Sequence, residues 1–333
     1  MILYKKDVVI SADRATNLKH MKIGIIGCGQ IAAAHLKGFL ASGAEVVAFA
    51  DADADRAGAM AEKTSGSRAF GDYRELISKS GAEAVIVCTP PNFHREIAVA
   101  ALGAGLHVLC EKPLAATLAD ALAIENAAAG SGRIFMTAFR HRFLPAHQTM
   151  KRLLSERGLG KPVIFQNIFG GPSRESAGKW FCNQSIAGGG VFLDTCIHGV
   201  DLFRFYCGEI QTCAGQAARD FAGTSVEDSG VMTLRAQGGT LGTVSGSWNI
   251  GTWRMAVELL TENGRVLYDY ADPLRIVVED ANGTIESVPV VKSEGFQEQA
   301  AYFLSCIQTG TPAEPGALDG RRAVEVITGL YNY

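Results

Sequence analysis

Short apolar runs alternate with alanine-rich segments from Met21 to about residue 140, and this alternation strongly constrains the fold. The apolar runs cover residues 22–27, 45–50, 84–89, 107–111 and 134–139. Each run is continuous rather than interrupted by polar residues, which predicts strands that are buried on both faces. The segments between the runs carry helical patterns, and strands that alternate with helices form a parallel sheet covered by those helices. We therefore predict a doubly wound α/β domain.

The pattern changes after residue 160. One helical segment covers about residues 190–206, β-rich stretches follow it, and helical patterns return near residues 294–309 and 319–330. The tripeptides "ENG" and "ANG" between the β-rich stretches are typical of hairpin turns. This half is predicted to be an α+β domain with an open, largely antiparallel sheet. The expected division is an N-terminal extension at 1–20, a dinucleotide-binding domain at 21–142 and a second domain at 143–333.

Residues 1–20 have no assigned role. They lack the apolar core of a signal peptide, and Met21 opens "MKIGIIGCG", which resembles a natural start. They are either an upstream extension or an ordered arm, and the sequence leaves both open.

Charge and cysteine content exclude several classes of protein. The formal net charge of −3 provides no basic field for nucleic acid or anionic lipid. No apolar run reaches the length that spans a bilayer, so no membrane partner is expected. The eight cysteines form no Cys-x-x-Cys pair, which favours buried thiols in a reducing compartment and predicts a cytoplasmic protein. No group of residues has convincing spacing for a metal site.

The first apolar run leads into Gly27-Cys28-Gly29-Gln30-Ile31-Ala32, at the start of a predicted helix. In such a turn the first glycine allows the tight bend, the second lets the backbone approach a pyrophosphate, and the alanine permits close helix packing. Asp51 ends the second apolar run, 19 residues after Ala32, where an acid hydrogen-bonds the ribose hydroxyls. The pattern predicts NAD rather than NADP, although Arg56 lies nearby. A tight turn without a ligand is the alternative.

Four segments together resemble the glucose–fructose oxidoreductase / inositol dehydrogenase (Gfo/Idh/MocA) family. They are the fingerprint at 27–32, "TPPNFH" with "EKP" at 89–94 and 111–113, "TAFRHRFLP" at 137–145, and "GGGVFLDTCIHGVDLF" at 188–203. The resemblance covers about residues 21–330. It implies a Rossmann domain, a C-terminal domain with an open sheet, NAD(P)-dependent oxidation or reduction of a carbohydrate, and homo-oligomers, often dimers or tetramers. Arg140 and His141 depart from the family, which often has Asn before paired basic residues.

Asp194, His198 and Asp201 interrupt the apolar helical segment. At 3.6 residues per turn they fall within an arc of roughly 60°, so a carboxylate could orient the imidazole as a base. The resemblance assigns Asp194 and His198 to substrate binding and proton transfer, and Asp201 is given a supporting role. The alternatives are a polar stripe that faces water or a core histidine with satisfied hydrogen bonds.

Lys112 follows the fourth main run, at the carboxyl edge where ligands bind in doubly wound sheets. An ammonium there can stabilise negative charge on the reacting oxygen, and the resemblance places a lysine in the active site. A surface lysine paired with Glu111 is the alternative. Glu111 is expected to contact the cofactor or the backbone, and the resemblance suggests a cis Lys112–Pro113 bond.

The "TPPNFH" turn is assigned to the nicotinamide end of the cofactor by the resemblance, through Thr89, Pro90, Asn92 and His94. Helix capping explains Asn92 equally well, and His94 is as readily a buried structural residue. His35, on the first predicted helix, is expected to be structural. Trp180 precedes the glycine triplet, where its face could flank a sugar ring, and plain packing is the alternative.

The combined prediction is an NAD(P)-dependent oxidoreductase that interconverts a secondary hydroxyl and a ketone on a sugar, an inositol-like polyol or a related carbohydrate. His198 would exchange the hydroxyl proton, Asp194 would orient His198, and Lys112 would stabilise the oxygen. Other activities on the same fold remain open: dihydrodiol and nucleotide-sugar dehydrogenases or reductases, and a non-enzymatic regulator that senses dinucleotides.

Overall fold

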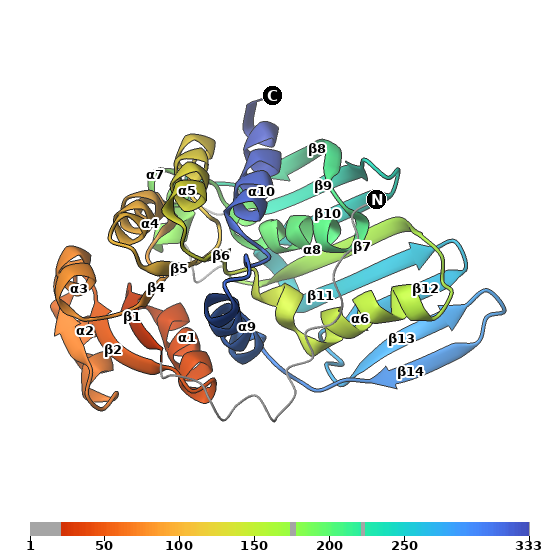
Figure 1. Cartoon of the computed structure of the whole chain (residues 1–333). Coiled ribbons are helices and arrows are strands. Elements are labelled where there is room, and N and C mark those ends of the chain that lie inside the picture. The colour runs from red at the N-terminus through yellow and green to blue at the C-terminus, as the bar shows by residue number, and fades with distance from the viewer. Residues whose placement is uncertain (1–20, 174–177, 221–223, 333) are drawn as a thin grey trace.

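The computed structural model describes residues 21–173, 178–220 and 224–332. The predicted extension at 1–20 lies outside the described residues. Figure 1 shows two sheets side by side, with the C-terminal helices between them. This arrangement confirms the predicted fold class, a Rossmann domain followed by a domain with a mostly antiparallel sheet.

The first sheet is parallel and has the strand order β3-β2-β1-β4-β5-β6. Its strands are β1 (Lys22–Ile26), β2 (Glu45–Ala50), β3 (Arg68–Phe70), β4 (Ala84–Val87), β5 (His107–Cys110) and β6 (Phe135–Thr137). Its helices are α1 (Gln30–Ala41), α2 (Ala54–Glu62), α3 (Tyr73–Lys79), η2 (Pro91–Phe93), α4 (His94–Gly103) and α5 (Leu118–Ser131). β4 is fully buried along its length, as the continuous apolar run predicts for a strand covered on both faces.

The second sheet has eight strands in the order β14-β13-β12-β11-β7-β10-β9-β8, and only β7 and β10 pair in parallel. The strands are β7 (Pro162–Pro172), β8 (Ile210–Ala218), β9 (Ser229–Ala236), β10 (Leu241–Ser247), β11 (Asn249–Thr261), β12 (Gly264–Asp269), β13 (Arg275–Asp280) and β14 (Ile285–Pro289). One face is buried: in β7, Phe165, Asn167 and Phe169 are buried while Ile164 and Gln166 are exposed. This period-two alternation is typical of a sheet covered on one side.

The helical segments of the second half surround this buried face and the domain boundary. They are η3 (Arg140–Phe143), α6 (Pro145–Glu156), η5 (Trp180–Cys182), α7 (Gln184–Ala187), a π-type turn (Phe192–Cys196), α8 (Ile197–Cys207), α9 (Phe296–Thr309), α10 (Ala317–Gly329) and η7 (Leu330–Asn332). α6 is a helix that the sequence patterns above do not indicate. Pro145 occupies its first turn, where the missing N–H of proline costs no helical hydrogen bond.

The last two long helices return to the first domain. α9 packs along α1, and α10 packs between α5 and α8 (Figure 1). The approach of α9 is close: a Cβ atom at Gly38 of α1 would lie 2.8 Å from the carbonyl oxygen of Phe296. The chain therefore crosses between the domains more than once, which fixes the edge of the first sheet against α8.

The helical stretch Gln184–Cys207 has 24 residues and passes a test of length and composition for a membrane span. The mean hydropathy of its tested 18-residue window is 1.2. However, 78% of the tested window is buried inside the fold. The short α7, the glycine triplet and α8 join end to end, so the segment serves as a core helix of this domain.

Candidate active site

The turn after β1 has the backbone geometry that the fingerprint predicts. Gly27 has a φ of +90°, and a Cβ atom there would lie 2.7 Å from the backbone carbon of Cys88. A non-glycine residue is therefore excluded on both counts. Gly29 precedes α1 in extended conformation, and nothing lies within 4 Å of a Cβ built on it. Ala32 is fully buried. Together these residues form an open cradle at a helix N-terminus, which fits a pyrophosphate.

Asp51 lies directly beside this turn. Its Oδ2 accepts a hydrogen bond of 2.7 Å from the backbone N–H of Cys28, and its Oδ1 accepts one of 2.9 Å from the N–H of Asp53. Arg56 is occupied by an exposed ion pair with Asp53, 3.0 Å from Nε to Oδ2. The carboxylate is thus held at the end of β2 next to the cradle, in the position of an acid that receives ribose hydroxyls.

Two polar side chains at the next strand end have unused hydrogen-bonding capacity. Thr89 Oγ1 and Asn92 Oδ1 are buried, and neither has a hydrogen-bond partner among the described residues. Buried polar atoms are normally paired, so such atoms beside a cradle fit a bound group that supplies the partner. Gln30, Ile31 and Pro90 complete the same edge and are partly or fully exposed. The predicted dinucleotide residues therefore gather at one sheet edge, and their donor and acceptor set fits a dinucleotide.

His94 was interpreted either as a residue at the nicotinamide end of the cofactor or as a buried structural residue. Its environment in the structure is the buried one. His94 is fully buried, and its Nε2 lies 2.8 Å from the carbonyl oxygen of Thr89. Its Nδ1 lies 3.0 Å from the carbonyl oxygen of Pro113 and 3.2 Å from that of Leu114. Burial lowers the pKa of His94 below its ordinary value. The ring joins the "TPPNFH" turn to the "EKP" turn and so fixes the two turns relative to each other.

Glu111 is buried and pairs with a histidine of the first helix. Its Oε1 lies 2.7 Å from Nε2 of His35, and its Oε2 accepts from the backbone N–H of Lys112 at 3.0 Å. Burial raises the pKa of Glu111, but His35 and Lys112 together lower it by more, so the net shift is downward. The carboxylate is therefore ionised and contacts the backbone, which is one of the two contacts expected for Glu111. The Lys112 ammonium pairs with Asp194 instead.

The Lys112 ammonium crosses from the first domain to the second. Nζ donates to Asp194 Oδ1 at 3.0 Å and to the backbone oxygen of Asp194 at 2.9 Å. The Lys112 side chain is 18% exposed and that of Asp194 is 35% exposed, so the pair is partly buried. The Lys112–Pro113 peptide bond is cis, in agreement with the expectation. The alternative of a surface lysine is wrong.

The helix that carries Asp194 and His198 is not regular, which corrects the expected arc. Residues Phe192–Cys196 form a π-type turn, and the α-helix begins only at Ile197. Such turns carry one extra residue and are frequent at functional sites. Asp194 therefore accepts from Lys112 and from Thr195 Oγ1. No hydrogen bond joins Asp194 to His198 among the described residues, so the predicted orientation of His198 by Asp194 is not what the structure shows.

His198 is more deeply buried than Asp194. It is 9% exposed, and its Nδ1 is buried without a hydrogen-bond partner among the described residues. Its ring lies 4.4 Å from that of His141, measured between centroids. Burial, followed by the positive charges of Lys112 and Arg140, holds the pKa of His198 well below its ordinary value. The imidazole is therefore neutral at physiological pH.

Asp201, given a supporting role, forms a buried ion pair away from His198. Both of its oxygens accept from Arg142, at 2.8 Å from Nε and 2.6 Å from Nη2. Arg142 also lies 3.4 Å from Asp319 of α10. This bidentate pair ties η3 to α8, which is a structural role.

Sequence reasoning missed a hydrogen-bonded group of three ring side chains, of which His141 packs against His198. They are His141, His147 and Tyr270, from η3, α6 and the turn after β12. The departure from the family pattern at Arg140 and His141 was the one available signal for this group. Tyr270 lies 123 positions after His147, so no local pattern relates it to the two histidines.

Trp180, whose ring could flank a sugar or simply pack, is partly exposed and partly packed in the structure. It is 44% exposed, and its ring packs edge-on against Phe181 at 5.7 Å between centroids. Phe181 in turn contacts Trp248, whose Nε1 donates to Thr195 Oγ1 at 2.9 Å. An aromatic group therefore leads from Trp180 to the residue next to Asp194.

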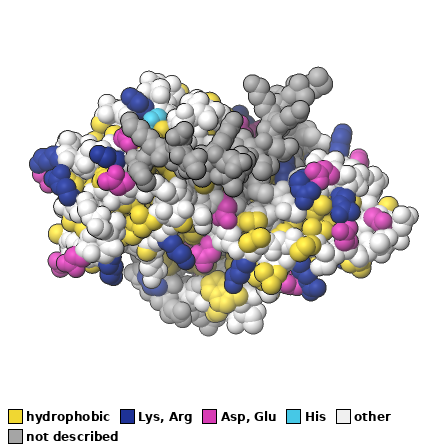
Figure 2. All heavy atoms as spheres, turned by 60° about the horizontal axis from the view of Figure 1, so that its bottom comes forward, with side chains coloured by type: hydrophobic (Ala, Val, Ile, Leu, Met, Phe, Trp, Pro, Cys, Tyr) yellow, Lys and Arg dark blue, Asp and Glu magenta, His cyan; other side chains and the backbone are white. Residues whose placement is uncertain are grey.

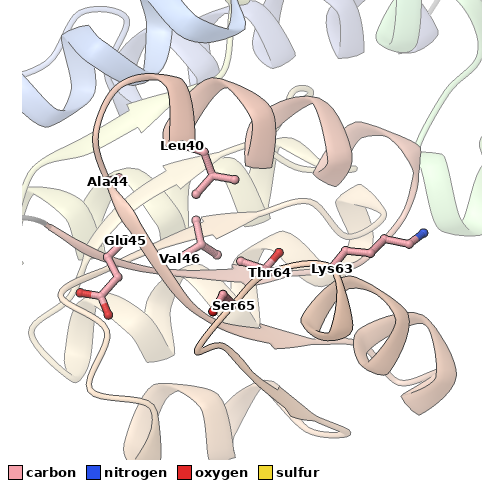
Figure 3. Close-up of a pocket in the computed structure, with 7 residues that line it drawn as sticks. All are labelled: Leu40, Ala44, Glu45, Val46, Lys63, Thr64 and Ser65. Atoms are coloured by element: carbon pink, nitrogen blue, oxygen red, sulfur yellow. The ribbon is translucent and has the colours of Figure 1, made fainter.

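A separate cavity of about 490 Å³ lies at the opposite end of the first sheet (Figure 3). Leu40 and Val46 point toward each other in it, whereas the charged ends of Glu45 and Lys63 point away. Because Glu45 and Val46 begin β2, this cavity lies at the amino end of the strands. Dinucleotides bind at the carboxyl ends, so the cavity is not part of the site described above.

On the face shown in Figure 2, Lys and Arg side chains are interspersed with Asp and Glu, without a region of one sign. No group of three or more His, Cys, Asp or Glu residues in the described part of the chain is arranged to hold a metal ion.

Comparisons with known proteins identify both domains. Residues 21–139 match the model of the "Oxidoreductase family, NAD-binding Rossmann fold", and residues 147–267 match that of the "GFO/IDH/MocA C-terminal domain". The chain is 28% identical to myo-inositol 2-dehydrogenase of Thermotoga maritima over 322 residues, which cover 91% of this chain and 93% of that protein. It is 33% identical to 1,5-anhydro-D-fructose reductase of Ensifer adhaerens over 224 residues, which cover 66% of each.

The solved structure of levoglucosan dehydrogenase in complex with NADH and levoglucosan has a TM-score of 0.89 to this chain. It is 22% identical and covers 94% of this chain and 96% of its own, which shows the shared fold. The two family matches together cover more than half of the chain. The chain therefore belongs to the Gfo/Idh/MocA family of oxidoreductases and carries that family's NAD-binding Rossmann domain.

Proposed function

We propose that this protein is an NAD-dependent dehydrogenase that interconverts a secondary hydroxyl and a ketone on a sugar or polyol. The observation that carries the proposal is the position of Lys112. Its Nζ lies 3.0 Å from Asp194 Oδ1, at the carboxyl edge of the dinucleotide-binding sheet, and the same helical segment carries the neutral His198. We infer that this cation and this neutral imidazole flank the hydroxyl that loses its proton.

The chemistry divides between the cofactor and these side chains. NAD, when bound in the cradle at Gly27 and Gly29, supplies the hydride acceptor. Lys112 donates hydrogen bonds to the substrate oxygen and stabilises the negative charge that develops on it. His198 accepts the hydroxyl proton, and gives it back when the ketone is reduced. Asp194 holds the ammonium in place through its side chain and its backbone oxygen.

The relatives support the substrate class. Myo-inositol 2-dehydrogenase, 1,5-anhydro-D-fructose reductase and levoglucosan dehydrogenase are proteins named for polyols or sugars, and they share the family of this chain. Polyhydroxylated substrates also suit this site, where charged and polar groups of both domains converge on one edge. The particular sugar or polyol is the unknown that the experiment has to supply.

The experiment is a spectrophotometric screen of NAD and NADP reduction with sugars, inositols and sugar acids. We expect reduction of NAD with at least one polyol. His198→Ala and Lys112→Ala should each abolish most turnover, while NADH still binds and quenches protein fluorescence. Lys63→Ala, a lysine at the opposite end of the sheet, is the matched control. NAD binding without reduction by any compound would refute the proposal and favour a dinucleotide-sensing protein.

We also propose that the protein is a dimer or tetramer that associates through the open face of its second sheet. Val231 of β9 and Leu241 of β10 are 53% and 52% exposed on that face, and Ile164 of β7 pairs with Leu241. Exposed apolar groups that lie together on a sheet are typical of an interface. Light scattering should report an oligomer, and Val231→Glu with Leu241→Glu should dissociate it. A monomeric parent protein would refute this proposal.

The thiols support a reducing compartment, and we propose the cytoplasm. None of the eight cysteines forms a disulfide, and burial raises the pKa of Cys28 to about 12 and that of Cys196 well above its ordinary value. Such thiols stay protonated and are poor nucleophiles. Fractionation of cells that express the tagged protein tests this location, and recovery in an oxidising compartment would contradict it.

A further inference from the structure

A chain of hydrogen bonds begins at His141 and runs through the second domain. His141 Nδ1 lies 2.6 Å from the hydroxyl of Tyr270, and the same hydroxyl lies 2.8 Å from Nε2 of His147. His147 Nδ1 lies 2.7 Å from the hydroxyl of Tyr206. That hydroxyl also lies 3.2 Å from the backbone oxygen of His147. The chain therefore has one end at His141, beside His198, and the other at a backbone carbonyl.

The buried histidines of this chain are neutral. His147 is fully buried, which lowers its pKa to about 3, and burial also holds the pKa of His141 well below its ordinary value. The charged and titratable groups around His141 are His198, Arg140, His147, Lys112 and Tyr270, and the cations among them disfavour a further positive charge. Each imidazole and each hydroxyl therefore carries one proton, and the chain has two possible directions.

In the first direction every proton of the chain is used. Tyr206 donates to the backbone oxygen of His147, His147 Nδ1–H donates to Tyr206, Tyr270 donates to His147 Nε2, and His141 Nδ1–H donates to Tyr270. This direction makes four hydrogen bonds with four protons. It leaves Nε2 of His141 as a lone pair.

In the opposite direction one proton has no partner. Tyr206 donates to His147 Nδ1, His147 Nε2–H donates to Tyr270, and Tyr270 donates to His141 Nδ1, which makes three hydrogen bonds. The remaining proton is on His141 Nε2, which is joined by no hydrogen bond to a residue in the described ranges. The first direction makes one more hydrogen bond than the opposite one, so the first direction is favoured.

We propose that Tyr206, His147 and Tyr270 are positioning residues that fix His141 as the Nδ1–H tautomer, so that His141 Nε2 accepts a hydrogen bond from a substrate hydroxyl beside the reacting one. The His141 and His198 rings are 4.4 Å apart between centroids, a spacing that suits hydroxyls on adjacent carbons. The substrate class that follows is a vicinal diol, and this part rests on the proposed function. The tautomer itself depends only on the protein.

The test is a measurement of histidine tautomers by long-range ¹H–¹⁵N NMR on ¹⁵N-histidine-labelled protein with NADH bound. The chain has seven histidines, so single substitutions can assign each signal. We expect His141 to carry its proton on Nδ1. The most informative variant is at the far end of the hydrogen-bond chain, because Tyr206→Phe removes the acceptor of His147 Nδ1–H. The proton of His147 should then move to Nε2, Tyr270 should reverse, and His141 should become the Nε2–H tautomer.

Two further variants separate this effect from a general disturbance. Tyr270→Phe should disconnect His141 from His147 and abolish its response to Tyr206→Phe. Tyr268→Phe is the control: its ring lies 4.7 Å from that of Tyr270 between centroids, and no hydrogen bond joins its hydroxyl to a described histidine. It should leave the His141 signals unchanged. An Nε2–H tautomer in the parent, or an unchanged tautomer in Tyr206→Phe, would overturn the inference.

A kinetic measurement addresses the substrate contact. With a polyol found in the screen, Tyr206→Phe should raise KM roughly three- to tenfold, the loss of one neutral hydrogen bond, while kcat changes little. An unchanged KM would overturn the substrate contact. If no polyol is oxidised, the proposed function fails, whereas the tautomer in the substrate-free protein still decides whether the chain positions His141.

Discussion

The Nζ atom of Lys112 lies 3.0 Å from Oδ1 of Asp194 and 2.9 Å from its backbone oxygen, across 82 residues of sequence. The lysine belongs to the end of the dinucleotide-binding sheet and the aspartate to the π-type turn that opens α8. A wide turn displaces Asp194 from the regular helix and points it toward the other domain. The ion pair therefore joins the two domains at the place where we propose that the chemistry occurs.

The charge of Asp194 should matter for turnover more than for cofactor binding. Asp194→Asn keeps an oxygen that can accept from Lys112 but removes the negative charge, so the ammonium loses its fixed position. We expect kcat/KM to fall roughly 10²-fold or more, in the range for loss of an electrostatic contribution to the transition state, with an unchanged dissociation constant for NADH. Steady-state kinetics and NADH fluorescence titration measure the two quantities. Glu156→Gln, at an exposed helical pair, is the control. Equal losses in both quantities would contradict the assignment.

Asp51 should determine the preference for NAD over NADP. Its carboxylate is fixed by the N–H groups of Cys28 and Asp53, beside the cradle. A 2′-phosphate at the ribose would meet this negative charge, and like-charge contacts cost several kcal/mol. Asp51→Ala should therefore shift the ratio of NADP to NAD activity upward by roughly 10- to 100-fold. Asp72→Ala removes a carboxylate that also accepts from a backbone N–H, at the start of α3, and should leave the ratio unchanged. The same ratio in Asp51→Ala as in the parent would show that another residue makes the distinction.

Local signals explain which parts of the site the sequence could predict. Gly27 and Asp51 end neighbouring strands of one alternating pattern, so their meeting follows from the topology of a parallel sheet. Lys112 and Asp194 come from different domains, and only the resemblance to a family placed them in one site. The fold class followed from the same alternation of apolar runs, which is confirmed by the strand order.

The parts that could not be predicted depend on distant contacts or on single-residue irregularities. One extra residue shifts the helical phase, but nearly all residues from Phe192 to Tyr206 are buried, so no apolar stripe exists in which the shift could be read. His141 and Tyr270 are separated by 129 positions, and neither lies in a spacing that indicates the other. The predicted pairing of Asp194 with His198 was wrong because it assumed a regular helix, whereas the π-type turn interrupts it.

Buried histidines should make the fold sensitive to acid. Burial lowers the pKa values of His94, His141, His147 and His198 below the ordinary value. When the pH falls below about 6.5, the unfolded chain binds protons at these positions and the folded chain does not. The free energy of unfolding should therefore decrease with falling pH, by up to about 1.4 kcal/mol per pH unit for each histidine.

Denaturant titrations between about pH 7.5 and pH 5 measure this slope, and the window follows from the ordinary histidine pKa of about 6.5. The loss should continue toward the folded pKa values, which for His147 is about 3. His147→Gln should reduce the slope by the contribution of one group, even if it also lowers stability at neutral pH. A free energy of unfolding that stays constant from about pH 7 to pH 5 would show that the histidines do not stay neutral in the fold.

The Arg142–Asp201 pair should be important for stability rather than for chemistry. Asp201 is 1% exposed, and burial raises its pKa even though the adjacent Arg142 guanidinium lowers it. Removing one partner leaves the other charge buried, so Asp201→Ala should lower the free energy of unfolding by about 3–5 kcal/mol. Arg142 retains only Asp319, at 3.4 Å, and Asp319 is shared with Arg204.

The double variant Arg142→Met with Asp201→Leu tests whether the lost stability comes from the uncompensated charge. Replacing both partners by apolar side chains removes the buried charge, so the double variant should be more stable than Asp201→Ala by roughly 2 kcal/mol or more. Arg152→Ala, at an exposed ion pair, should change the free energy of unfolding by less than about 1 kcal/mol. Denaturant unfolding measures all three variants. A double variant less stable than Asp201→Ala would mean that the bidentate geometry itself, rather than the unpaired charge, holds η3 against α8.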